Sequence, residues 1–270
     1  MAIGSVGSRC AQLSLLLLLG CNPQAGSSEH AREREPARQS PASAAPAPST
    51  VAPARLDVVE VTTGGARRDE KLALIIALHG LGDRPESFAR LFVGLGARAR
   101  ILLPRAPDAW GEGRSWFPFR AADGDPLRSR GISGAAERVA SEIPRWVSER
   151  PTSGKPVVTG FSQGGMLTLA IAAQHPALIS SGVAIGGALP EPLWPSLDAA
   201  RPAVHIVALH GQDDDLVPIE PTRRGIDALV ARGFDARLEA FPGVGHHIPS
   251  EMRARLFELL ALELARAPQP

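Results

Sequence analysis

Residues Pro156–Gly165 read Pro-Val-Val-Thr-Gly-Phe-Ser-Gln-Gly-Gly, and they are the strongest indication of the type of fold. A short apolar run precedes the serine, and the apolar stretch Met166–Ala173, which resembles a buried helix, follows it. A Gly-x-Ser-x-Gly pattern between a strand and a helix is typical of a sharp turn that holds a serine hydroxyl exposed above a sheet. Glycines flank the serine because such a turn leaves no room for side chains. The sequence therefore predicts that Ser162 is a nucleophile.

The chain beyond Arg55 alternates short apolar runs with amphipathic stretches. This order predicts an α/β fold with a mostly parallel central sheet and helices on both faces. The expected strands are Leu56–Val61, Leu72–Leu78, Ile101–Leu103, Val157–Thr159, Gly182–Ile185, Val204–Leu209 and Arg237–Ala240. The expected helices are Pro85–Ala97, Ser133–Ser148, Gly164–Gln174, Glu220–Ala231 and Pro249–Ala265.

Length and composition limit the classes of protein to which the chain can belong. The chain has 270 residues, of which 44% are hydrophobic and 21% charged, so it is long enough to bury one sizeable core. The formal net charge is +1. Because no basic stripe appears either, we expect no nucleic-acid partner. We expect one domain over residues 56–270.

The N-terminal residues 1–21 have a different composition. Arg9 gives a weakly basic start, and the apolar run Leu13–Leu19 is broken only by a serine. A membrane span needs about 20 apolar residues, and this run offers about half that number, so it predicts an export signal. The last four residues of the segment 1–21 are Leu-Leu-Gly-Cys. They resemble the lipobox of bacterial lipoproteins, in which the cysteine is lipidated. The resemblance implies a lipid anchor on Cys21 and a place in the bacterial cell envelope, the alternative being an ordinary secretory signal.

The cysteine count agrees with this interpretation. The chain has two cysteines. Cys10 would leave with the signal, and Cys21 alone would remain, so the sequence predicts no disulfide and no thiolate metal site. Residues 22–55 are rich in Pro, Ala, Ser, Glu and Arg, which predicts a disordered tether.

A serine nucleophile on such a sheet needs an acid and a histidine after later strands, in the chain order serine, acid, histidine. The turn His210–Pro218 follows an expected strand and holds three adjacent aspartates. The small-residue loop Phe241–Pro249 follows the next strand and holds two adjacent histidines. We expect the histidine to take the serine proton and the aspartate to orient the imidazole, which requires neither a metal nor a cofactor. The alternatives are a solvated turn for the aspartates, and surface residues or metal ligands for the histidines.

Negative charge that develops on the substrate oxygen needs hydrogen-bond donors. We expect them to be the backbone amides of Gln163 and of Leu81, which lies in the loop His79–Asp83. This loop is no phosphate-binding loop, because no Gly-Lys-Ser or Gly-Lys-Thr follows it. His79 and His210 close strands, and we expect both to brace loops.

The connection 104–131 has little periodicity and holds several aromatic residues. Long ordered loops are commonly functional. Two interpretations stay open for Trp116 and Phe117: they line a substrate pocket, or they pin the loop onto the body of the protein.

Together these motifs resemble the phospholipase/carboxylesterase family of α/β-hydrolases, which includes acyl-protein thioesterases and bacterial carboxylesterases. The resemblance spans about Leu72–Leu262, and its most specific parts are Leu78–Asp83, Gly160–Gly165, His210–Pro218 and Gly245-His246. It implies a serine esterase that cleaves carboxylic esters or thioesters through an acyl-enzyme. The expected substrate is a small-molecule or lipid ester.

The resemblance also assigns individual residues. The family nucleophile falls on Ser162 and the oxyanion donors fall on Leu81 and Gln163. The family acid falls on Asp214 rather than on either neighbouring aspartate. The family histidine follows a glycine, which selects His246 over the histidine after it.

The chain departs from the family pattern in two places. Pro118 stands where similar proteins usually carry an acidic residue, so the acyl-chain preference of relatives does not transfer. The export signal and tether are the second departure, because an exported enzyme cannot act on acylated proteins of the cytosol. Two alternatives therefore stay open: a lysophospholipase or polyester depolymerase of the same fold, and an envelope-binding lipoprotein without catalysis.

Overall fold

Strands and helices alternate along the described part of the chain, which in this computed structural model comprises residues 55–118, 126–197 and 203–266. The strands are β1 (Val58–Thr63), β2 (Leu72–Leu78), β3 (Ala99–Pro104), β4 (Asp108–Trp110), β5 (Gly113–Ser115), β6 (Thr152–Phe161), β7 (Ser181–Ile185), β8 (His205–Gly211) and β9 (Asp235–Phe241). The helices are α1 (Pro85–Phe88), α2 (Pro126–Ser148), α3 (Gln163–Gln174), α4 (Ile219–Ala231) and α5 (Ser250–Arg266), with 3₁₀ turns η1 (Ala89–Phe92), η2 (Pro176–Leu178) and η3 (Glu191–Leu193).

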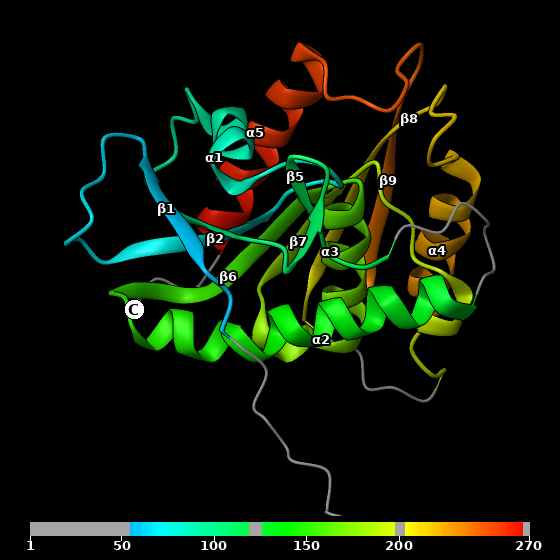
Figure 1. Cartoon of the computed structure of the whole chain (residues 1–270), viewed down its shortest axis with the longest axis horizontal. Helices are drawn as coiled ribbons and strands as arrows, with labels where there is room; N and C mark the ends of the chain where they lie inside the picture. Colours follow the sequence, from blue (N-terminus) through cyan, green and yellow to red (C-terminus); the bar gives the residue numbers. More distant parts are fainter. Residues whose placement is uncertain (1–54, 119–125, 198–202, 267–270) are drawn as a thin grey trace, which may run out of the picture. The chain divides into compact units, whose positions relative to one another are not determined.

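Seven of the strands form one sheet in the order β1-β3-β2-β6-β7-β8-β9 (Figure 1). Strand β1 runs antiparallel to β3, and all other neighbours in this sheet are parallel. Strands β4 and β5 form a separate antiparallel hairpin. The expected α/β fold with a mostly parallel sheet is therefore confirmed.

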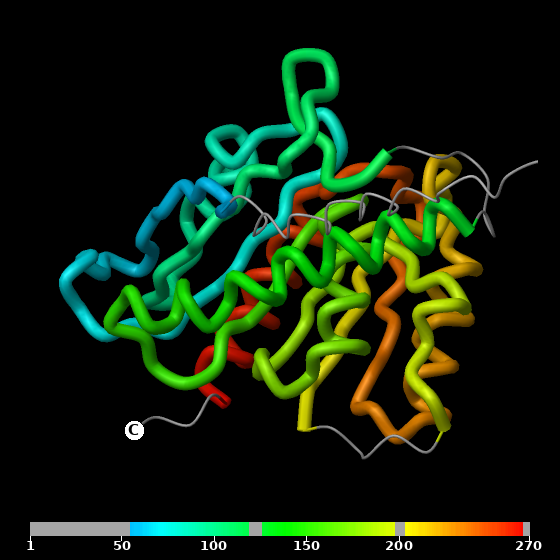
Figure 2. The backbone as a smooth tube through the Cα atoms, turned by 60° about the horizontal axis from the view of Figure 1, so that its bottom comes forward, coloured from blue at the N-terminus to red at the C-terminus, as the bar shows by residue number. Residues whose placement is uncertain are grey.

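Helices cover both faces of the sheet, and the side chains of β2 alternate between the two cores. Leu74, Ile76 and Leu78 point into a core that is shared with α2, α3 and α4. Ile75 and Ala77 point into the other core, which contains α1 and α5. The arrangement is visible in Figures 1 and 2, where α2 crosses one face and α5 lies behind the sheet. The described residues belong to one compact unit.

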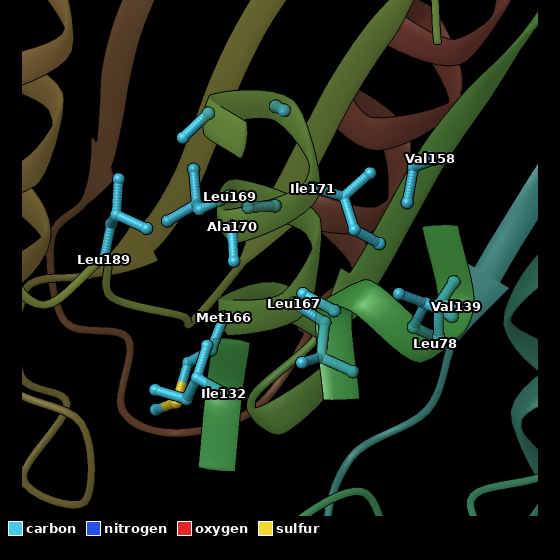
Figure 3. Packing of buried hydrophobic residues seen from close by; sticks show 14 of the residues in the cluster. Leu78, Ile132, Val139, Val158, Met166, Leu167, Leu169, Ala170, Ile171 and Leu189 are labelled. Atoms are coloured by element: carbon cyan, nitrogen blue, oxygen red, sulfur yellow. The ribbon is translucent and has the colours of Figure 1, made fainter. Parts of the chain in front are cut away.

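Helix α3 lies unusually close to the sheet. A methyl group on Gly164 would stand 1.9 Å from the carbonyl oxygen of Leu78, so only glycine allows the helix to start there. Figure 3 shows Met166 beside Ile132, and Leu167 of α3 on the side of Val139. Because α3 packs between the sheet and α2, the turn that leads into it is held on both sides.

Most expected elements are found, and the differences have local causes. The helix expected at Pro85–Ala97 is wrong: α1 passes at Ala89 into one 3₁₀ turn, which ends at Phe92, and the chain leaves the helical conformation at the extended Val93 and at Gly94, whose φ is 88°. The connection 104–131 holds the hairpin β4-β5, and α2 starts at Pro126 rather than at Ser133. The signal 1–21, the anchor Cys21 and nearly all of the tether lie outside the described residues.

Candidate active site

Ser162 occupies the turn between β6 and α3 in a strained conformation. Its φ of 56° is the one positive value among the described residues other than glycine. The turn is held by two backbone hydrogen bonds: the Ser162 N–H donates to the Ile185 carbonyl at 2.9 Å, and the Met166 N–H donates to the Ser162 carbonyl at 2.9 Å. Strain of this kind costs about 1–3 kcal/mol and clusters at functional sites. The turn therefore holds the hydroxyl in a fixed place at the carboxyl edge of the sheet.

The structure brings Ser162, His246 and Asp214 together from three loops that are far apart in the sequence. The Nε2 atom of His246 lies 2.9 Å from Oγ of Ser162. Its Nδ1 atom lies 2.7 Å from Oδ2 of Asp214. The ring of Phe161 packs on the imidazole, with centroids 4.8 Å apart, and fixes its tilt. An imidazole bonded on both sides in this way accepts the serine proton at Nε2 while the carboxylate holds the Nδ1–H tautomer.

Asp214 is held in place by the backbone of its own turn. It is 5% exposed. Oδ1 accepts hydrogen bonds from the N–H groups of Leu216 at 3.1 Å and Val217 at 2.8 Å, which leaves Oδ2 to face His246. Asp213 and Asp215 are exposed. Among the three adjacent aspartates, Asp214 is thus the one whose carboxylate faces the imidazole.

Two backbone N–H groups beside Ser162 have no protein acceptor within the described residues. They belong to Leu81 and to Gln163, the first residue of α3. The loop of Leu81 abuts the serine, because a methyl group on Gly80 would lie 3.5 Å from Cβ of Ser162. Unpaired donors that flank a nucleophile are what an oxyanion site requires. The role of these two amides stays a prediction, which the geometry supports.

His79 fixes the orientation of one of these amides. The Ala106 N–H donates to Nε2 of His79 at 3.3 Å, so Nδ1 carries the ring proton and donates to the Gly80 carbonyl at 2.7 Å. That carbonyl belongs to the same peptide unit as the Leu81 N–H. Because a peptide unit is planar and trans, holding its carbonyl toward His79 turns its N–H the opposite way. The expectation that His79 and His210 brace loops is confirmed, since His210 is also buried and bonded to its loop.

The two buried histidines predict a pH dependence of stability. Burial lowers the pKa of His79 and of His210 below the usual value of 6.5. The unfolded chain therefore binds more protons than the folded one as the pH falls through about 6.5, and the free energy of unfolding should fall with it. His79→Asn keeps a donor near the Nδ1 position and removes one titrating ring. In urea unfolding at pH 5–8, its free energy of unfolding should therefore fall less steeply with falling pH than that of the wild type. An equally shallow decline in His247→Asn, where the ring is exposed, would contradict this origin.

Trp116 and Phe117 pin their loop onto the protein. Both are 4% exposed and belong to the core. The Trp116 indole N–H donates to the His79 carbonyl at 2.9 Å, and the Trp116 backbone N–H donates to Oε1 of Gln163 at 2.9 Å. Nε2 of Gln163 donates to the Phe117 carbonyl at 3.0 Å. A lining role of these aromatic residues in a substrate pocket stays a prediction.

Backbone atoms of two loops of the site meet at Gly211. One loop is the acid turn, His210–Pro218, and the other is the histidine loop, Phe241–Pro249. A methyl group on Gly211 would stand 2.1 Å from the Val244 carbonyl oxygen, so Gly211→Ala must push the two loops apart. We expect this substitution to lower kcat/KM for a short p-nitrophenyl ester by about 10²-fold, because a displacement near 1 Å has such an effect. Gly96→Ala is the control, since a methyl group on Gly96 meets nothing within 4 Å. Equal activity of the two variants would show that this contact does not position the site.

Three contributions to the site were missed from the sequence. Phe161 packs on the imidazole, the Gln163 side chain ties the 115–117 segment to the start of α3, and Thr222 bonds to His210. Phe161 and Gln163 flank the serine, which is a signal that points to them. Thr222 gives no such signal, because α4 reaches the site only in the folded protein.

No group of three or more His, Cys, Asp or Glu side chains in residues 55–118, 126–197 and 203–266 is arranged to hold a metal ion. In the same ranges, every helix is too short or too polar to span a lipid bilayer.

The chain is similar to several known esterases in sequence or in fold. A probable carboxylesterase of Oryza sativa subsp. japonica is 29% identical over 206 residues, which cover 71% of this chain and 75% of that protein. Carboxylesterase SOBER1 of Arabidopsis thaliana is 27% identical over 194 residues, which cover 66% and 84%. The crystal structure of esterase PE8 superposes with a TM-score of 0.65 over 77% of this chain and 98% of that one, at 23% identity.

Residues 62–263 match the sequence profile that is described as phospholipase/carboxylesterase. The matched segment contains the serine turn, the acid turn and the histidine loop, and it covers most of the chain. The chain therefore belongs to the phospholipase/carboxylesterase family of α/β-hydrolases and is a serine hydrolase of the carboxylesterase type.

Proposed function

We propose that Ser162 cleaves carboxylic esters or thioesters through an acyl-enzyme intermediate. The unbroken chain of hydrogen bonds from Ser162 through His246 to Asp214, with distances of 2.9 and 2.7 Å, carries the proposal. As Oγ attacks the acyl carbon, its proton passes to Nε2 of His246, and the N–H groups of Leu81 and Gln163 bind the oxyanion. The imidazolium then protonates the leaving alcohol or thiol. Water repeats the sequence on the acyl-enzyme and releases the acid.

A cavity of about 320 Å³ lies next to α3, the helix that follows Ser162, and is the proposed place for part of the substrate. It lies between the first turns of α2, the segment after β7 and the first turns of α4. Met166 links it to the site, because its N–H bonds to Ser162 and its sulfur lies 3.8 Å from Nη2 of Arg128, a residue of the cavity wall. The lining residues are Arg128, Ser129, Ala188, Leu189, Pro190, Glu191, Pro192, Trp194, Pro221 and Arg224.

The size of this cavity favours substrates of modest length, since binding cavities for small molecules span about 300–1,000 Å³. A series of p-nitrophenyl esters with acyl chains of increasing length should show the highest kcat/KM for short chains. A preference for long chains, or for lysophospholipid or polyester over short esters, would replace this substrate class by one of the alternatives.

An activity-based phosphonate probe tests the nucleophile directly. The probe should label the protein, and mass spectrometry should place the adduct on the peptide that contains Ser162. Labelling should be absent in Ser162→Ala. An adduct on another residue, or labelling that survives the substitution, would overturn the assignment.

We also infer that a lipid on Cys21 anchors the enzyme in a bacterial cell envelope. The Leu-Leu-Gly-Cys sequence and the Pro/Ala/Ser-rich segment after it support this proposal. A radiolabelled fatty acid, fed to bacteria that express the full chain, should be incorporated by the wild type and by Cys10→Ser. Cys21→Ser should incorporate none, and label in that variant would refute the anchor.

A further inference from the structure

His210 is a second buried imidazole beside the catalytic acid, and the proposed reaction does not use it. It lies in β8, four residues before Asp214, and it is 0% exposed. Its Nε2 atom lies 2.8 Å from the Val217 carbonyl oxygen and 3.4 Å from Oδ2 of Asp214. Its Nδ1 atom lies 3.1 Å from Oγ1 of Thr222. Both ring nitrogens therefore face polar atoms of the acid turn or of α4.

The partners of His210 fix its tautomer. The Val217 carbonyl and the Asp214 carboxylate only accept hydrogen bonds, so Nε2 must carry a proton. The titratable groups that face the ring are Asp214 and His246. Burial opposes a charge on this ring, so it is the neutral Nε2–H form that faces the acid turn. Nδ1 is then an acceptor for the Thr222 hydroxyl.

Thr222 connects this imidazole to a second loop of the site. Its Oγ1 lies 2.9 Å from the Gly187 carbonyl oxygen and 3.1 Å from Nδ1 of His210, and its single hydroxyl proton is donated to one of these two acceptors at a time. The neighbouring Gly186 borders the catalytic histidine, because a methyl group there would lie 3.6 Å from the His246 ring. The hydroxyl thus links the turn beside His246 to the imidazole below Asp214.

On the side of the acid turn, Val217 connects His210 to Asp214. The Val217 residue that accepts from His210 also donates its own N–H to Oδ1 of Asp214 at 2.8 Å. A single residue therefore transmits the position of the buried imidazole to the carboxylate. No solvent reaches His210 to replace a lost partner.

We propose that His210 and Thr222 are positioning residues for the reaction. They hold the turn of Asp214 and the Gly186-Gly187 turn in fixed positions relative to each other, on either side of His246. The proposal rests on the proposed function, since it assigns the carboxylate and the imidazole their catalytic roles. It predicts that these two residues affect kcat and leave KM unchanged, because neither lines the substrate cavity.

Paired variants of His210 test which ring nitrogen matters. A glutamine amide reaches about as far as Nε2 and an asparagine amide about as far as Nδ1, so His210→Gln keeps the donor to Val217 and His210→Asn removes it. We expect His210→Asn to lower kcat for a short p-nitrophenyl ester by about 10-fold to 100-fold. His210→Gln should stay within about threefold of the wild type.

Variants of Thr222 remain informative if the buried histidine variants do not fold. Thr222→Val has the same shape without the hydroxyl and should lower kcat by about tenfold at unchanged KM. Thr222→Ser keeps the hydroxyl and should restore kcat. Circular dichroism and urea unfolding would establish that the compared variants are folded.

A double-mutant cycle separates positioning from general stability. If His210 acts through the carboxylate, His210→Asn should have little further effect in an Asp214→Asn background, and the Thr222→Val effect should shrink likewise. Full kcat in both His210→Asn and Thr222→Val, or losses that simply multiply with Asp214→Asn, would overturn the proposal. Failure of the proposed function itself looks different, because Ser162→Ala would then remain active.

Discussion

Replacing Ser162 by alanine is expected to lower kcat for a short p-nitrophenyl ester by about 10⁴-fold to 10⁶-fold. The hydroxyl lies 2.9 Å from Nε2 of His246, and within the described chain no other hydroxyl hydrogen-bonds to that nitrogen. Alanine leaves the base and the two free amides in place, so the remaining rate should come from binding and oxyanion stabilisation alone. Steady-state assays at substrate concentrations above KM would measure the loss of kcat.

Ser181→Ala is the matched control for this substitution. Ser181 is a buried serine on β7, the neighbour of the strand that leads to Ser162, and its hydroxyl has no hydrogen-bond partner in the described structure. Both variants lose one hydroxyl group, from the partly buried Ser162 and from the buried Ser181. If Ser181→Ala kept its activity and Ser162→Ala also kept more than about one per cent, attack by Ser162 would be ruled out.

The order and the spacing of the motifs made the site predictable from the sequence. Parallel strands end at one edge of the sheet, so a serine after β6, an aspartate after β8 and a histidine after β9 had to gather there. The apolar run Leu72–Leu78 even gave the bounds of β2, because a strand buried on both faces is apolar throughout.

Contacts between distant residues were not predictable in this way. Choosing Asp214 among three adjacent aspartates required the family pattern, because the difference lies in which carboxylate the turn buries. The helix expected at Pro85–Ala97 ends early, as α1 and a 3₁₀ turn before the extended Val93, and no periodicity in the sequence reveals this end. Thr222 reaches His210 across the space between α4 and β8. Such pairings depend on the packing of whole elements.

The fixed orientation of the Asp214 side chain makes the effect of Asp214→Asn predictable. Oδ1 accepts two backbone N–H groups, from Leu216 and Val217, so the amide oxygen of asparagine should take that place. The amide NH₂ must then face Nδ1 of His246 and donate to it. This forces the ring proton onto Nε2, which can no longer accept the serine proton.

We expect Asp214→Asn to lower kcat by about 10⁴-fold with little change in KM, because only the tautomer of the base is altered. Asp213→Asn and Asp215→Asn are controls in the same turn, and both should stay near the wild-type rate because their carboxylates are exposed. Measured at pH 8 on one ester, the three variants assign the acid without reference to any relative. A loss in Asp213→Asn or Asp215→Asn as large as in Asp214→Asn would show that the charge of the whole turn matters, whereas loss in Asp214→Asn alone means that its single hydrogen bond to His246 sets the direction of proton transfer.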